Sequence, residues 1–287
     1  MALDDTLWFT ENPTADGSTF SLKITGKLHE EQTPFQKIEV YGTEGFGNLM
    51  VIDGYIMLTA RDNYLYHEML AHPVLFTHPN PKRVLIIGGG DCGTLREVLR
   101  HPEVAQVQQV DIDAGVTRAA ERFFPELCES NNDPRAELHF ADGIQWVQEA
   151  TPGSYDVIIV DSTDPVGPAI GLFSEPFFRD CHRALGDDGI IVQQSESPLL
   201  NMQILTDMHK AMRGAGYADV QTLHFPQPVY PSGWWTCTMA AKHAFKGFRI
   251  ADAVAKPFPT RYYSAEVHQG ALALPPFMKE AFAKIAG

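Results

Sequence analysis

The first part of the chain has the hydrophobic pattern of short β-strands. Apolar residues alternate with polar ones, or β-branched residues cluster, over 21–28, 36–41 and 48–52. Asp53-Gly54 stands between the apolar pairs 51–52 and 55–56, and such a dipeptide is the strongest short hairpin signal in a sequence. The pattern predicts an antiparallel arrangement of strands that begins the chain.

A helical pattern follows over residues 64–76 and ends near the turn-rich segment His78-Pro79-Asn80-Pro81. Proline and asparagine at this density favour a connection between folding units. We therefore expect an N-terminal β-strand domain over residues 1–79 and a second domain over residues 80–287.

Beyond Pro81 the pattern changes to apolar runs that alternate with helical stretches. Strands are expected at 83–88, 106–111, 136–140, 155–161 and 189–194. Helices are expected from the glycines after residue 88 through Arg100, over 114–124, from about residue 143, and over 173–185. This alternation is typical of right-handed βαβ units, whose parallel sheet is buried on both faces. The sequence predicts an α/β fold in which a Rossmann-like domain with a parallel sheet follows the β domain along the chain.

Composition and charge narrow the class of protein. The 287 residues carry a formal net charge of -14, which argues against a nucleic-acid partner, because phosphate binding needs clustered Lys and Arg. The four cysteines form no C-x-x-C pair, which disfavours a zinc ribbon and suits a reducing compartment. The first residues, MALDDTLWFTENP, lack the pattern of a secretory signal, and no apolar stretch approaches a membrane span. We expect a cytoplasmic protein without a membrane partner.

A glycine turn follows the first strand of the second domain. Gly88, Gly90 and Gly93 match G-x-G-x-x-G, in which missing side chains let the backbone approach a ligand. Asp111 ends the next strand, where a carboxylate can accept hydrogen bonds from ribose hydroxyls. Asp142-Gly143 ends the third, within reach of an adenine amine. Taken singly, these positions also fit a tight turn, a solvated strand end and a helix N-cap.

Asp91 distinguishes between classes of cofactor. A carboxylate in this turn would repel the pyrophosphate of a dinucleotide, whereas it would attract a positive centre. S-adenosyl compounds carry a sulfonium and an amine but no phosphate. The sequence therefore favours an adenosyl sulfonium as the ligand of the turn.

The segment after the fourth strand carries two further carboxylates. The strand 155–161 delivers Asp161 to the edge where open α/β sheets bind ligands, and Asp164 follows in a turn fixed by Pro165. The stretch 166–172 has the composition of a mobile loop that could cover a site. A turn residue followed by a helix-entry signal is the alternative explanation of these two aspartates.

Three other patterns predict packing rather than chemistry. His67 and His72 are five residues apart, and zinc binding on a helix needs a spacing of four. Trp234-Trp235 could form an aromatic cage for a cation, but strand residues in the core are the simpler interpretation. Cys92 lies beside a helix N-terminus and is expected to pack. No metal site is predicted.

Several separate motifs, in order along nearly the whole chain, resemble the spermidine synthase (aminopropyltransferase) family, most closely over residues 81–242. The motifs that carry the resemblance are Phe35-Gln36-Lys37-Ile38, the segment 48–54, Arg61-Asp62, Tyr66-His67-Glu68-Met69, Gly88-Gly89-Gly90-Asp91, Asp161-Ser-Thr-Asp-Pro-Val-Gly-Pro168, Gln194, Tyr230-Pro-Ser-Gly233 and Tyr262 to His268.

This resemblance implies a methyltransferase-type sheet and a specific reaction. In such enzymes decarboxylated S-adenosylmethionine gives its aminopropyl group to a diamine, usually putrescine, and the products are spermidine and methylthioadenosine. The donor is a co-substrate, so no resident cofactor is implied, and a homodimer built partly through the N-terminal β region is expected. The roles implied are Asp161 as general base assisted by Tyr66; Gln36 and Asp111 at the ribose; Asp142 and Gly143 at the adenine; Asp91 at the amine, with Gly88 and His67 on the donor side; and Asp164, Gln194 and Tyr230 at the diamine, with Trp8 as a wall of its channel.

The chain departs from the family pattern at four positions. Met57 and Ala60 replace a common Gln and Glu, Cys92 replaces a glycine, and Asp111 replaces the commoner Glu. Met57 matters most, because it leaves the exact amine acceptor open. Two alternatives also remain: a methyltransferase on the same fold, and a polyamine-binding protein without activity.

Overall fold

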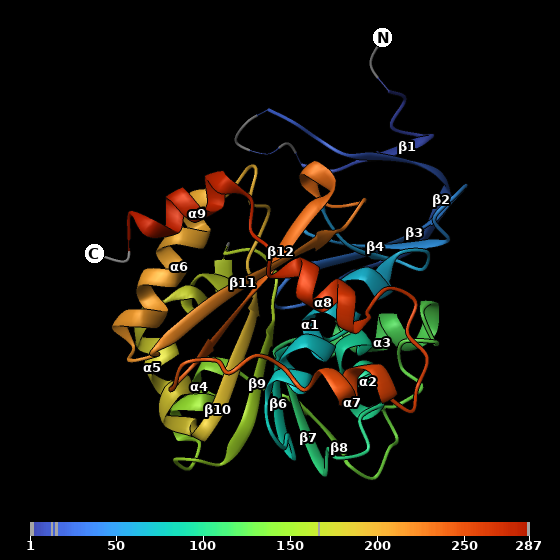
Figure 1. Ribbon diagram of the computed structural model, residues 1–287. Helices are drawn as coiled ribbons and strands as arrows, with labels where there is room; N and C mark the ends of the chain where they lie inside the picture. The colour runs from blue at the N-terminus through green and yellow to red at the C-terminus, as the bar shows by residue number, and fades with distance from the viewer. Residues whose placement is uncertain (1–2, 13, 15–16, 166, 286–287) are drawn as a thin grey trace.

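The chain folds into a smaller antiparallel sheet and a larger mixed sheet covered by helices (Figure 1). The computed structural model describes residues 3–12, 14, 17–165 and 167–285. The smaller sheet contains β1 (Trp8–Thr10), β2 (Ser21–Gln32), β3 (Lys37–Thr43), β4 (Asn48–Ile52) and β5 (Tyr55–Thr59). The larger sheet contains β6 (Arg83–Gly88), β7 (Gln106–Asp111), β8 (Ala136–Phe140), β9 (Tyr155–Asp161), β10 (Leu185–Gln194), β11 (Asp219–Pro226) and β12 (Trp234–Ala241).

The helices surround the larger sheet. They are α1 (Asn63–Thr77), α2 (Gly93–Leu99), α3 (Ala114–Phe123), α4 (Gly143–Glu149), α5 (Glu175–Ala184), α6 (Met202–Gly214), α7 (Ile250–Ala255), α8 (Ala265–Ala271) and α9 (Pro276–Ala283), with 3-10 helices η1 (Gly167–Phe173) and η2 (Pro231–Gly233). Within the described residues, no helix is long and apolar enough to cross a membrane.

The smaller sheet is an antiparallel meander in the order β1-β2-β3-β4-β5. The predicted hairpin at Asp53-Gly54 is confirmed, and both residues have positive φ, 51° and 87°. Two such conformations in succession match the twist of the flanking strands. One face of this sheet packs on α3, where Ile38, Val40 and Met50 contact Ala120 and its neighbours. Helix α3 therefore ties the smaller sheet to the larger one.

The larger sheet has the order β11-β12-β10-β9-β6-β7-β8. Strands β6 to β10 are parallel, as expected, but β12 is antiparallel to both β10 and β11. The parallel sheet expected from the sequence is therefore confirmed over β6 to β10, and β11 and β12 extend it as an antiparallel pair. The physical reason is the short connection through η2: a parallel pair needs a long crossover, whereas β11 and β12 join as a hairpin.

Alternate residues of β6 face opposite layers, as period 2 requires. Val84 and Ile86 pack with α1, α2, α7 and α8, whereas Leu85 and Ile87 pack with α4, α5 and α6. Helices thus bury both faces, in agreement with the continuous apolar runs of the sequence. The fold is that of a methyltransferase-like α/β protein with an N-terminal β sheet.

Helix α1 joins the two sheets in the chain and is almost completely buried. It begins directly after β5 and packs against β9, β10 and α2. Tyr66 and His67 lie in its first turns, so the helix presents them at the carboxyl ends of the parallel strands. The elements after β10 had no sequence-based assignment except the strand at Trp234-Trp235, which β12 confirms.

Candidate active site

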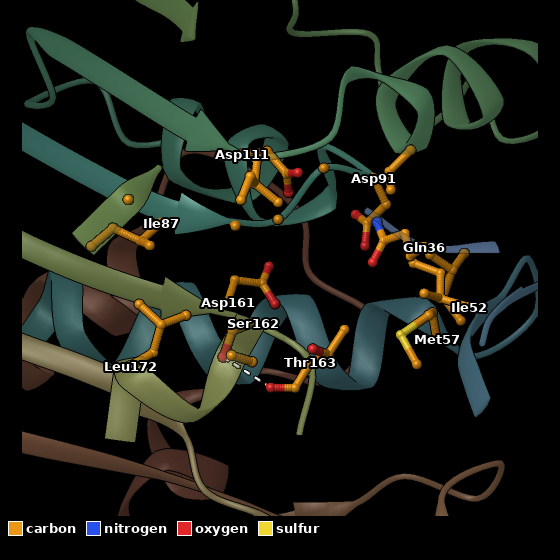
Figure 2. A pocket seen from close by; sticks show the side chains of 18 of the residues that line it. Gln36, Ile52, Met57, Ile87, Asp91, Asp111, Asp161, Ser162, Thr163 and Leu172 are labelled. Atoms are coloured by element: carbon orange, nitrogen blue, oxygen red, sulfur yellow. Dashed lines mark hydrogen bonds between the residues drawn. The ribbon is translucent and has the colours of Figure 1, made fainter. Parts of the chain in front are cut away.

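Two adjoining pockets lie where the parallel strands end and the smaller sheet begins. The larger pocket runs over the glycine turn and the ends of β7 and β9 (Figure 2), and the smaller pocket lies toward β5 and η2. Both share a wall made of Met57, Tyr66, Ser162, Thr163 and Tyr230. A ligand in one pocket can therefore meet a ligand in the other at this junction.

The glycine turn is held against the end of β9. The Gly89 amide donates to the Asp161 carbonyl at 2.7 Å, and a Cβ on Gly88 would lie 2.2 Å from the same oxygen. Gly88 also has φ 82°, which residues with side chains rarely adopt. Packing alone thus requires glycine at position 88. The same turn lines the larger pocket, so the tight-turn explanation and the ligand-cradle explanation are both compatible with the structure.

Asp91 lines the larger pocket (Figure 2) and contacts His67, which lines the same pocket. His67 Nε2 lies 3.2 Å from Asp91 Oδ1, and the Gly93 amide donates to the same oxygen at 2.6 Å. Burial opposes ionisation of Asp91, but the contacts with His67 and Gly93 outweigh it and lower the pKa of its carboxyl. Asp91 therefore stays anionic on the wall of the larger pocket.

Asp111 lines the same pocket at the end of β7. Burial raises the pKa of Asp111 to about 6, although the Asp113 amide donates to Oδ1 at 2.8 Å. Gln36 enters from the loop before β3, and its Nε2 donates to Asp113 Oδ2 at 3.1 Å. Gln36 and Asp111 thus line the same pocket, and Asp113 contacts both, through its carboxyl and its backbone amide.

Asp142 caps helix α4, because its Oδ1 accepts from the Ile144 amide at 2.8 Å. The N-cap explanation of this residue is confirmed. Asp142 and Gly143 also line the larger pocket, next to Ile144. Both residues therefore lie on the pocket wall, and their role at an adenine stays a prediction.

Asp161 lines the larger pocket, directly before Ser162 and Thr163 of the wall that the two pockets share (Figure 2). Tyr66 donates to its Oδ1 at 2.7 Å and Thr94 to its Oδ2 at 2.6 Å. Burial, and then the negative charge of Asp91, raise the pKa of Asp161. Burial and Asp161 together hold the pKa of Tyr66 well above its usual value, so the phenol remains a donor. This arrangement orients a carboxylate whose proton affinity is increased.

A second group of carboxyls lies in and beside the smaller pocket. Asp164 follows β9 and lines the pocket, and burial raises its pKa. Glu196 follows β10 and lies next to Asp164, outside the pocket lining; burial and Asp164 raise its pKa to about 9, and Asn201 donates to its Oε2 at 2.8 Å. Glu11 enters from the smaller sheet, and burial raises its pKa to about 7. No Lys or Arg is among the described residues that line either pocket.

The sequence analysis missed Glu11, which lines the smaller pocket, and Glu196, which lies next to Asp164. It also predicted a place in the site for Trp8, which the structure does not show. Trp8 lines neither pocket among the described residues. Successive strand residues point to opposite sides, so Phe9 and Glu11 face inward where Trp8 and Thr10 do not. Glu196 could have been found, because it lies two residues beyond a strand end already assigned to the site.

Gln194 and Tyr230 line the smaller pocket, as the sequence predicts. The Tyr230 hydroxyl donates to the Met57 carbonyl, and its ring lies edge-on to Trp235 at 4.8 Å. Trp235 is buried, as expected for a strand residue in the core, and it also lines the smaller pocket.

The remaining sequence patterns pack. Cys92 is fully buried, and its neighbour Cys128 and burial hold its pKa above the usual value, which confirms packing. His72 contacts Glu97 and His101 on the opposite side of the helix from Asp91. Among the described residues no group of side chains could hold a metal ion. The stretch 166–172, expected as a mobile loop, forms most of η1 (Gly167–Phe173) and lines the larger pocket through Ala169 and Leu172; Val166 lies outside the described residues.

The chain matches two family models that together cover most of its length. The Spermine/spermidine synthase domain matches residues 63–249, and the Spermidine synthase tetramerisation domain matches residues 7–60. The polyamine aminopropyltransferase of Methylococcus capsulatus is 64% identical over 97% of this chain and 98% of its own. The polyamine aminopropyltransferase of Thioalkalivibrio sulfidiphilus is 63% identical over 98% of this chain and 99% of its own.

Solved structures agree with these matches. A spermidine synthase crystallised with the transition state analogue AdoDATO is 34% identical, with a TM-score of 0.94 over 98% of this chain and 96% of its own. The spermidine synthase of Thermotoga maritima is also 34% identical, with a TM-score of 0.92 over 97% and 94%. The protein is thus a transferase with a methyltransferase-like fold. More specifically, the chain belongs to the spermidine synthase family.

Proposed function

We propose that this protein transfers the aminopropyl group of decarboxylated S-adenosylmethionine to putrescine, giving spermidine and methylthioadenosine. The observation that carries the proposal is the series of carboxyls through both pockets, from Asp91 past Asp161 to Asp164, with no Lys or Arg among the described lining residues. Donor and diamine together bring several positive charges into one site. Without these carboxyls their repulsion would be on the order of several kcal/mol.

The larger pocket suits the donor. Asp111 and Gln36 offer oxygens to ribose hydroxyls, and Asp142 with the Gly143 amide lies where an adenine edge can pair. Asp91 remains anionic and faces the pocket, so it can hold the ammonium of the aminopropyl arm. The sulfonium then lies between Asp91 and the junction wall, close to Asp161.

The chemistry is a displacement at carbon. The amine nitrogen of the diamine attacks the aminopropyl carbon bonded to sulfur; the C–N bond forms, the C–S bond breaks, and the sulfonium becomes a neutral thioether. Freeing the lone pair of an alkyl ammonium costs roughly 4 to 5 kcal/mol near neutral pH. Asp161, with its raised proton affinity, receives the proton that the nitrogen loses, and Tyr66 keeps the carboxylate oriented. Alignment of nitrogen, carbon and sulfur at the junction supplies much of the remaining acceleration.

The smaller pocket suits the far end of the diamine. Glu11 and Asp164 line it, and Glu196 lies next to Asp164; all three carboxyls have raised pKa values because burial leaves them without a counter-charge. An ammonium supplies that counter-charge. Gln194 and Tyr230 border the same space and orient the chain of methylenes.

Asp91 also gives a reason for rejecting ordinary S-adenosylmethionine. That compound would bring its own carboxylate toward Asp91, and like charges in a buried site are costly. A methyltransferase would need no group of carboxyls in the second pocket. The observed charges therefore support aminopropyl transfer over methyl transfer.

Three further properties belong to the proposal. The protein needs no resident cofactor, since the donor is consumed as a co-substrate. It works in the cytoplasm, in keeping with its unpaired cysteines. It forms a homodimer through the N-terminal sheet, which size-exclusion chromatography with light scattering would test against a tetramer.

The decisive experiment incubates the purified protein with decarboxylated S-adenosylmethionine and, separately, putrescine, cadaverine, agmatine and spermidine. Methylthioadenosine should form fastest with putrescine, and mass spectrometry should identify spermidine. Ordinary S-adenosylmethionine serves as the matched donor control and should give no transfer. No methylthioadenosine with any amine would refute aminopropyl transfer, whereas faster reaction with another amine would refute only the choice of putrescine.

A further inference from the structure

His67 is a buried imidazole with a single polar contact. Its side chain is 2% exposed, and Nε2 lies 3.2 Å from Asp91 Oδ1. Its ring packs directly on the first residue of α2, because a Cβ on Gly93 would lie 2.2 Å from Cε1 and 2.3 Å from Nδ1. Nδ1 is buried and has no partner among the described residues. The ring therefore has no room to turn away from Asp91.

The two protonation states of this ring differ in what they require. A neutral ring with its proton on Nε2 donates to Asp91 and leaves Nδ1 as an unpaired acceptor. A charged ring places a second proton on Nδ1, where no acceptor lies within the described structure. A buried donor without a partner costs free energy, and no hydrogen bond at Nδ1 offsets that cost. The charged ring can therefore be stabilised only by negative charge nearby.

That negative charge is present when the site is empty. The titratable groups that face His67 are Asp91 in the turn, Asp161 on β9, Tyr66 beside it on α1 and Arg96 on α2. Arg96 opposes protonation, but it is engaged by Glu97 at 2.9 Å. Burial also opposes protonation, yet Asp91 and then Asp161 outweigh it and raise the pKa of His67. In the empty site, two carboxylates thus support one imidazolium.

Donor binding removes this support. Decarboxylated S-adenosylmethionine carries an ammonium and a sulfonium, and the proposed pose places both beside the same two carboxylates. A charged His67 would then be a third cation within a few ångströms of them. We propose that His67 is a positioning residue that is imidazolium in the empty enzyme and releases its Nδ1 proton to solvent when the donor binds. Its Nε2–H stays on Asp91 and keeps the free oxygen aimed at the ammonium.

This inference rests on the proposed function and predicts a specific pH dependence of binding. Below the pKa of the empty-site histidine, each donor that binds displaces one proton, so the donor Kd should fall by up to about tenfold per pH unit as pH rises. Methylthioadenosine has the same adenosine and sulfur but neither positive charge. It should bind without releasing the proton, with a flatter pH dependence.

The test is isothermal titration calorimetry on the whole protein between pH 6 and 8, in two buffers with different ionisation enthalpies. Decarboxylated S-adenosylmethionine should release close to one proton at the lower pH, and methylthioadenosine close to none. Equal proton release by both ligands would assign the proton to Asp111 or another group at the adenosine, and would overturn the proposal. Absence of proton release with the charged donor would overturn it as well.

His67→Gln supplies the matched variant, because an amide can still donate to Asp91 but cannot ionise. The donor should then bind with a pH slope no steeper than that of methylthioadenosine; an unchanged slope would refute the role of His67. If the variant does not fold, the two-ligand contrast on the unmodified protein decides. The proposed function fails in a different way: the donor would not bind, or no methylthioadenosine would form.

Discussion

Asp91 in the larger pocket and the carboxyls at the smaller pocket have opposite pKa shifts. Asp91 has His67 and a backbone amide as partners, and the pKa of its carboxyl is lowered. In the smaller pocket, Glu11 has one buried oxygen with no partner among the described residues, and its pKa is raised to about 7. Glu196, next to Asp164, has a pKa raised to about 9. Asp91 is therefore ionised before ligands arrive, whereas the carboxyls at the smaller pocket are held partly neutral.

This difference assigns distinct sources of binding energy to the two halves. A preorganised carboxylate binds a cation without first losing a proton. Carboxyls that burial keeps neutral must ionise when an ammonium arrives, so binding there depends on pH and on each member of the group. Asp91 should therefore be available to the ammonium of the donor at all ordinary pH values, so that pH affects donor binding through the His67 proton, whereas in the acceptor pocket pH acts on the binding carboxyls themselves.

Asp161→Asn should give the largest effect, since it removes the base that both halves share. We expect the turnover rate to fall by about a thousandfold, within the range of general-base catalysis. The donor Kd should change by less than about threefold, because the amide keeps the size of the side chain. Rates of methylthioadenosine formation and calorimetry measure the two quantities. Asp207→Asn, an exposed carboxylate on α6, is the matched control; turnover preserved in Asp161→Asn would refute the assignment of the base.

Asp91→Asn should weaken donor binding by about a hundredfold, because a charge-assisted hydrogen bond contributes up to about 3 kcal/mol. The KM for the diamine should hardly change, since the diamine contacts the other pocket. Binding of methylthioadenosine, which lacks the ammonium, serves as the internal control and should remain within about threefold. Equal loss for both ligands would mean that Asp91 supports the fold of the turn and not the amine.

Glu11→Gln should raise the diamine KM by about thirtyfold, through loss of one charged contact at the distal ammonium. The donor Kd should not change. Glu44→Gln makes the same charge change on the same sheet at a half-exposed side chain and should leave both constants unaltered. An unchanged diamine KM in Glu11→Gln would restrict the acceptor site to Asp164 and Glu196.

The affinity for the diamine should rise by just under tenfold between pH 6 and pH 8. Glu11 has a raised pKa of about 7, so its ionised form, which attracts the ammonium, becomes dominant over this interval. The same shift has the opposite sign for stability: a carboxyl with a raised folded pKa disfavours the folded state as pH rises through 4.5 to 7. Putrescine should therefore raise the melting temperature more at pH 8 than at pH 6, and Glu11→Gln should remove most of that difference.

The sequence predicted the residues of the larger pocket better than those of the smaller pocket. Gly88, Asp91, Asp111 and Asp161 follow strands that read clearly as parallel, and the carboxyl ends of such strands meet at one edge. Their meeting is a local consequence of the fold. Glu11 reaches the site because Phe9, on the same side of the chain at β1, packs in a buried cluster with Ile56 of the smaller sheet and Val229 after β11. The antiparallel β11–β12 pair, which brings Tyr230 to the site, likewise depends on long-range pairing that no local pattern specifies.

Met57→Gln should have the smallest effect, although it restores a residue common in the family. Met57 lies on the wall that both pockets share, and its carbonyl accepts the Tyr230 hydroxyl, a contact that any side chain preserves. Glutamine has nearly the same length as methionine, and the substitution removes no polar contact. We therefore expect a small effect: the ratio of kcat/KM for putrescine to that for cadaverine should change by about threefold or less. A much larger change would place selection of the amine at the junction. Acceptor choice would then depend on the shape of the shared wall, and the carboxyls of the smaller pocket would serve only to attract cations of any length.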